Sequence, residues 1–114
     1  MALFGIDLAI SNATDHLLSS RQSGDDNSAQ SGMIEALEAL IRIKRVSSSD
    51  AHISCLVKMK YNAASKKANE AIELFGESST TAKAVSKFAT FAIAMDAIGI
   101  PVDSTYEQIL ANYA

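Results

Sequence analysis

The side chains of this sequence that offer the most obvious chemistry are lysines. The stretch Lys58–Lys67, KMKYNAASKK, places four of them within ten residues of a chain whose formal net charge is −3. Between Arg42 and Lys67, seven basic residues stand against one acid, Asp50, whereas the other segments hold three basic and twelve acidic residues. This asymmetry indicates either an anionic partner or two oppositely charged surfaces that meet within one fold or between subunits.

The four lysines separate into two pairs on a helical wheel drawn at about 100° per residue. Lys58 and Lys66 fall on the polar side, where solvation alone explains them. Lys60 and Lys67, one heptad apart, fall within the apolar stripe, toward one of its edges. The stripe is centred on Ile53, Val57, Ala64, Ala68, Ala71 and Phe75.

Lys60 and Lys67 therefore have three interpretations. Their methylenes lie on neighbouring side chains while the ammonium groups stay in water, or they pair with carboxylates of a neighbouring helix or subunit, or they line a groove that takes an anionic ligand. The carboxylates considered for the second interpretation are Glu35, Glu38 and Asp15.

A second basic cluster, Arg42, Lys44 and Arg45, lies in the last turn of an expected helix, where cations complement the helix dipole. Its position has this structural explanation. The cluster is nevertheless kept, with Lys60 and Lys67, among the candidate contacts to a partner or an anion.

Metal and catalytic sites lack the residues they need. His16 and His52 have no second histidine at helical spacing, and His52 with Cys55 is at best a pair of ligands. The carboxylate pairs Glu35-x-x-Glu38 and Glu70-x-x-Glu73 lack the Glu-x-x-His pattern of a di-iron bundle. We therefore expect no metal, no cofactor and no catalytic residue, and a protein that is not an enzyme.

The elements that position these residues are all helical. Apolar residues recur at steps of three and four, and no segment alternates apolar and polar residues as a strand does. The prediction is a single all-α domain over residues 1–114, a bundle of about five helices with a flexible loop at 20–28. The expected helices are 2–19, 29–46, 48–75, 81–98 and 104–113.

Local signals set the expected helix ends. Ser47 with Asp50 resembles a capping box before the third helix, and Gly76 suits its end. Gly99, followed by apolar Ile100 and then a proline, predicts the end of the fourth helix. The fifth helix, 104–113, is expected to dock its apolar residues against the fourth.

The fourth helix is apolar on two sides. One stripe, with Phe88, Phe91 and Met95, is an ordinary core face, so the other side must be covered as well. Either this helix is central in a monomer, or its second side joins another subunit, and we favour a homodimer. The candidate oligomer face is Ala82, Ser86, Ala89, Ile93 and Ala97.

These observations favour a small regulator, adaptor or inhibitor that acts by binding another protein, as a homodimer. The alternative is a binder of an anionic ligand or nucleic acid through the basic 42–67 region. Nucleic acid is the weaker option, because the expected last helix has no basic residue to neutralise phosphates. We expect a cytoplasmic protein with no membrane partner: the lone Cys55 suits a reducing compartment, no basic leader precedes the apolar N-terminus, and no apolar run approaches ~18 residues.

Overall fold

The computed structural model describes residues 2–24, 27–100 and 102. These residues form four α-helices, α1 (Ala2–Gln22), α2 (Asn27–Val46), α3 (Asp50–Phe75) and α4 (Ser79–Ala97), and no strand occurs among them. The predicted all-α bundle is therefore confirmed for the part of the chain that is described. The predicted fifth helix, 104–113, lies outside the described residues. No described helix is long and apolar enough to span a membrane.

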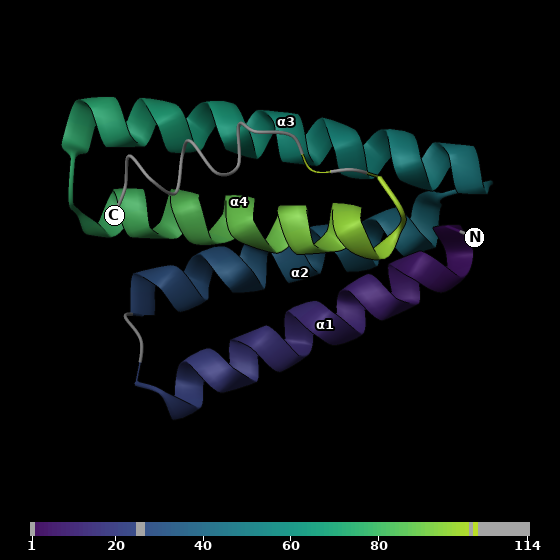
Figure 1. The fold of residues 1–114 in the computed structure, drawn as a ribbon, viewed down its shortest axis with the longest axis horizontal. Helices are drawn as coiled ribbons and strands as arrows, with labels where there is room; N and C mark the ends of the chain where they lie inside the picture. Colours follow the sequence, from purple (N-terminus) through teal and green to yellow (C-terminus); the bar gives the residue numbers. More distant parts are fainter. Residues whose placement is uncertain (1, 25–26, 101, 103–114) are drawn as a thin grey trace.

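The helix α4 is central in the bundle. It packs against α1, α2 and α3, whereas α3 has few contacts with α1 or α2. Figure 1 shows α3 and α4 running antiparallel side by side, with α2 behind α4 and α1 on the edge away from α3. The second apolar side of α4 is thus partly covered within the chain, which agrees with the alternative that α4 is central in a monomer.

The core follows the helical periodicity of the sequence. Phe88 and Phe91 of α4 are fully buried, and the ring of Phe88 lies 5.1 Å, centroid to centroid, from that of Tyr61 on α3. The predicted stripe of α3 is also buried, with one exception. Phe75 is 57% exposed, because Thr81 of α4 meets α3 at Ala71 and the last turn of α3 extends beyond that contact.

The start of α3 differs from the prediction. Its N-cap is Ser49, whose hydroxyl oxygen accepts a hydrogen bond from the His52 backbone N–H at 3.1 Å. The predicted pair of Ser47 and Asp50 is wrong, because the Ser47 hydroxyl instead donates to the Ile43 carbonyl at 2.6 Å and so belongs to the end of α2. The ring Nδ1 of His52 accepts from the Ser48 N–H, which gives this histidine a capping role.

The glycine signals at the ends of α3 and α4 are confirmed. Gly76 follows α3 with φ 56°, and its N–H donates to the Ile72 carbonyl. After α4, Gly99 has φ 84° and donates to the Asp96 carbonyl, while Ile100 donates to the Met95 carbonyl. These two bonds form a Schellman motif, which positive φ at the glycine makes possible.

The predicted loop at 20–28 is too long. Helix α1 continues to Gln22 and α2 already begins at Asn27. Ser20 is 3% exposed and continues the buried face of Ala13 and Leu17 at helical spacing, so burial extends α1 into this polar stretch.

Candidate binding groove between α3 and α4

A groove with a volume of about 430 Å³ lies where α3 and α4 face each other near the first half of α2. We call it the lysine groove. Its described lining residues are Glu35 from α2, Lys60, Ala63, Ala64 and Lys67 from α3, and Thr80, Lys83, Ala84, Lys87 and Phe91 from α4.

The floor of the lysine groove is apolar and built from small side chains. Ala64 and Phe91 are buried, and Ala63 and Ala84 add two more methyl groups at the wall. Because alanine ends at Cβ, three alanines on facing helices leave space that longer side chains would fill. The hollow therefore follows from the sequence of α3 and α4.

The rim of the lysine groove carries two rows of lysine. Lys60 and Lys67 of α3 are seven residues apart, which is about 10 Å along a helix, and Lys83 and Lys87 of α4 are about 6 Å apart. Both α3 lysines are exposed, so their ammonium groups are hydrated and able to meet an anion. This arrangement suits a ligand with several negative charges and an apolar surface between them.

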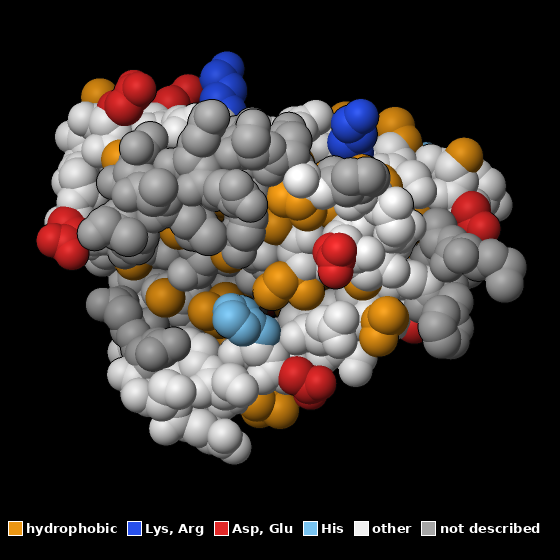
Figure 2. All heavy atoms as spheres, viewed as in Figure 1, with side chains coloured by type: hydrophobic (Ala, Val, Ile, Leu, Met, Phe, Trp, Pro, Cys, Tyr) orange, Lys and Arg blue, Asp and Glu red, His pale blue; other side chains and the backbone are white. Residues whose placement is uncertain are grey.

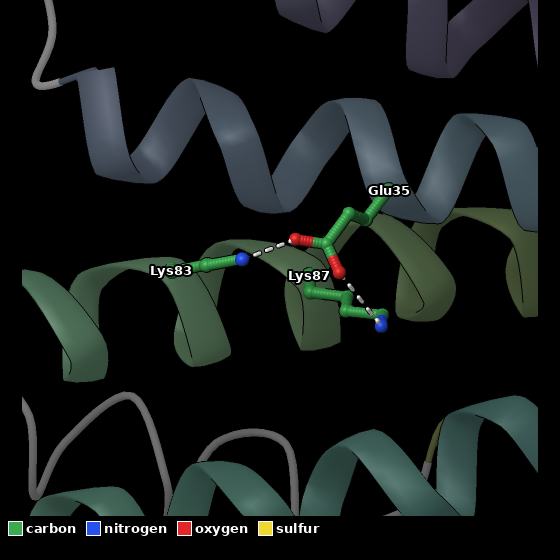
Figure 3. Close-up of polar contacts among 3 residues, drawn as sticks. All are labelled: Glu35, Lys83 and Lys87. Atoms are coloured by element: carbon green, nitrogen blue, oxygen red, sulfur yellow. Dashed lines mark ion pairs between the residues drawn. The ribbon is translucent and has the colours of Figure 1, made fainter.

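One carboxylate already lies within this rim. Glu35 of α2 pairs with Lys83 at 2.5 Å and with Lys87 at 3.5 Å, and Figure 3 shows its two oxygens directed at the two ammonium groups. The hydrogen bond from Lys83 is the main cause that holds the pKa of Glu35 below its ordinary value of 4.5. Partial burial acts in the opposite direction and is outweighed by the two lysines.

Replacing Glu35 by glutamine should make stability less dependent on pH below neutrality. Since the folded-state pKa is lowered, the ion pairs stabilise the fold fully above pH 4.5, and this contribution is lost as the pH falls through the folded-state pKa. At pH 7 we expect Glu35→Gln to lower the free energy of unfolding by no more than about 1 kcal/mol, because all three groups are partly exposed. Urea denaturation at pH 7 and pH 3 measures the difference, which should shrink at pH 3. A constant difference would contradict this account.

The structure brings together only part of the predicted basic site. Lys60 and Lys67 line the lysine groove, whereas Arg42, Lys44 and Arg45 do not. Lys44 instead forms an ion pair with Asp7 of α1. The seven basic residues of the 42–67 region therefore do not all contribute to this groove.

The structure bears on the three interpretations of Lys60 and Lys67. Among the described residues, the lysines paired with carboxylates are Lys44, Lys83 and Lys87. Glu35 is thus occupied by α4, and pairing of Lys60 or Lys67 with another described helix is not observed. Exposure of both side chains agrees with hydrated ammonium groups, and their position agrees with an anion-binding groove.

Sequence reasoning missed Lys83 and Lys87 as site residues. They stand four apart on one helix, on either side of Ala84 in the sequence, so a signal was present. They lie outside the basic segment, and only the packing of α4 between α2 and α3 places them opposite Lys60 and Lys67.

The other candidate residues have ordinary positions. His16 and Cys55 are exposed, and the ring of His52 accepts the Ser48 hydrogen bond described above. Over the described ranges, no group of three or more His, Cys, Asp or Glu side chains is arranged to hold a metal ion.

The candidate oligomer face is partly covered within the chain. Ala82, Ser86, Ala89, Ile93 and Ala97 are all half-buried, and α4 contacts every other described helix. The homodimer therefore stays a prediction that the packing of α4 does not require.

Light scattering tests the homodimer directly. We predict a dimer mass at micromolar concentration, lost in Ala89→Glu because a charge at a covered apolar position is unfavourable, and retained in Ser86→Ala. A wild-type mass of 12.1 kDa at high concentration would contradict the prediction.

Comparisons of the chain with protein families, with curated proteins and with solved structures found no match. The lysine groove is therefore the feature of the molecule from which a function can be inferred.

Proposed function

We propose that this protein is a non-enzymatic interaction module that binds a segment of another protein in the lysine groove. The observation that carries the proposal is the combination of an apolar floor with four lysines around it. Binding sites are typically concave and mostly apolar, with a few polar groups that fix orientation. Regulator, adaptor and inhibitor roles are all compatible with such a site.

Binding is favoured over catalysis by the chemistry of the lining. The groove's carboxylate, Glu35, is engaged by two lysines, which leaves it poorly placed to act as a base. Lys60 and Lys67 are exposed, and hydrated ammonium groups suit anion recognition better than nucleophilic attack. The remaining lining side chains are alanines, a phenylalanine and Thr80.

Binding of nucleic acid or another anion through the whole 42–67 region is the second candidate. It has less support, because this region divides between the lysine groove and the end of α2, where Lys44 already pairs with Asp7. Figure 2 shows a face of the molecule on which the visible Lys and Arg side chains lie along the α3 edge, with acidic side chains both beside them and over the rest of the face. A broad basic surface for phosphates is not seen on that face.

Affinity capture from the native cell tests the proposal when the proteins retained by the wild type are compared with those retained by variants of the lysine groove. Ala63→Trp places a bulky ring in the lysine groove at an exposed position, and Asn62→Trp adds the same ring to the neighbouring exposed residue, which does not line it. We expect a protein retained by the wild type and by Asn62→Trp to be lost from Ala63→Trp. Identical sets of captured proteins for all three would overturn the proposal.

A further inference from the structure

We infer that the segment bound in the lysine groove is an acidic amphipathic helix of a partner protein, with carboxylates on both sides of an apolar stripe. This inference rests on the proposed function and adds the chemistry of the partner. It follows from three features of the groove: its floor, the spacing of its lysines and the carboxylate that already lies in its rim.

The apolar floor of the lysine groove favours a partner segment that carries an apolar stripe. Ala63, Ala64 and Ala84 line a hollow whose base is the buried ring of Phe91. Removing a partner's apolar side chains from water in this hollow is favourable, whereas a purely ionic ligand would leave the apolar surface uncovered. The occupant therefore has an apolar side as well as charges.

The spacing of the groove lysines favours a helical partner segment. Lys60 and Lys67 are one heptad apart, so carboxylates one heptad apart on a helix running alongside α3 would meet both of them. Lys83 and Lys87, one turn apart on α4, match carboxylates one turn apart on the other side of the same helix. A small ligand with a single carboxylate would use only part of this rim.

Glu35 shows how a helix presents an acid to this rim. Its carboxylate comes from α2 and bridges Lys83 and Lys87 (Figure 3). No described carboxylate forms an ion pair with Lys60 or Lys67, so the α3 row is the one available to a partner. Glu35 thereby acts as a competitor for the α4 row, and its removal should strengthen binding of an acidic helix.

The probe is a synthetic peptide of about five helical turns, ~18 residues, with a leucine stripe flanked by glutamates. A second peptide carries lysine in place of each glutamate, and a third has the composition of the first in an order that destroys the amphipathic pattern. Fluorescence anisotropy measures the Kd of each peptide with the full chain. Circular dichroism confirms that every variant is folded.

Charge reversal provides matched variants on one helix. Lys60→Glu with Lys67→Glu changes the groove, and Lys58→Glu with Lys66→Glu makes the same change in charge at exposed α3 positions that do not line it. For the acidic peptide we expect a Kd about tenfold weaker with the first pair and within about twofold of the wild type with the second. Glu35→Gln should tighten the Kd several-fold.

Three results would overturn the inference. The first is binding of the lysine peptide or the reordered peptide as tightly as the acidic amphipathic peptide. The second is an equal effect of the two charge-reversal pairs on the Kd of the acidic peptide. The third is displacement of the acidic peptide by duplex oligonucleotide with the same dependence on Lys60 and Lys67. If captured proteins still depend on Ala63 while the acidic peptide fails to bind, the proposed function stands and the inference on partner chemistry falls.

Discussion

Replacing Phe88 by alanine is expected to lower the free energy of unfolding by about 4 kcal/mol. Phe88 is fully buried: its exposed fraction is 0%, and it belongs to the core cluster formed by all four described helices. Its ring also packs at a tilt against that of Tyr61, which links α4 to α3. Truncation removes both the apolar burial and this aromatic contact and leaves a cavity.

Urea denaturation followed by circular dichroism measures this loss, and Phe75→Ala is its control. Phe75 is the same residue type in the neighbouring helix but is 57% exposed, so its truncation should change the free energy of unfolding by about 0.5 kcal/mol or less. Because single domains of this size are stable by only ~5–15 kcal/mol, Phe88→Ala should leave a visibly destabilised chain. Similar effects of the two substitutions would mean that the core is centred elsewhere.

The contrast between these two phenylalanines shows what helical periodicity predicts. The spacing of apolar residues placed Phe88, Phe91 and Met95 on the core face of α4, and all three are buried. The same reasoning placed Phe75 on the core face of α3. Periodicity gives the side of the helix on which a residue lies, but it does not tell how far along that side a neighbouring helix provides cover.

Some helix ends could likewise be predicted from the sequence, and others could not. Gly76 and Gly99 were predictable because their positive φ is a local requirement that glycine meets with little strain. The start of α3 was not, because Ser47, Ser48 and Ser49 are equally good caps by composition. The choice depends on where α2 ends, since the Ser47 hydroxyl is held by the Ile43 carbonyl.

The α3 side of the candidate site could be predicted from the sequence, but the α2 and α4 sides could not. The helical wheel separated Lys60 and Lys67 from Lys58 and Lys66, and the structure places only the first pair in the lysine groove. Lys83, Lys87 and Glu35 come from two other helices, and their meeting depends on how α2 crosses α4. The backbones of α2 and α4 come close to each other at residues 32 and 83, and neither residue was singled out from the sequence.

Gly32 is the residue that lets α2 approach α4 closely. A Cβ added at Gly32 would overlap the carbonyl oxygen of Lys83 and lie 3.1 Å from both the Lys83 carbonyl carbon and the Lys87 nitrogen. These are backbone atoms, which cannot move without displacing the whole helix. Glu35 lies one turn after Gly32, so the same close approach brings its carboxylate to Lys83 and Lys87.

Gly32→Ala is therefore expected to lower the free energy of unfolding by about 2 kcal/mol, as overpacking outweighs the gain in helix propensity of up to ~1 kcal/mol. Ser31→Ala is the matched control, because it is the neighbouring residue of α2 and already has a Cβ, and it should change stability by about 0.5 kcal/mol or less. Urea denaturation compares the two variants with the wild type.

Separation of α2 from α4 should also weaken the Glu35 ion pairs, so that the effect of Glu35→Gln at pH 7 becomes smaller in the Gly32→Ala background. An alanine variant as stable as the wild type would show that the helices do not approach this closely, and the geometry proposed for the α4 side of the lysine groove would have to be abandoned.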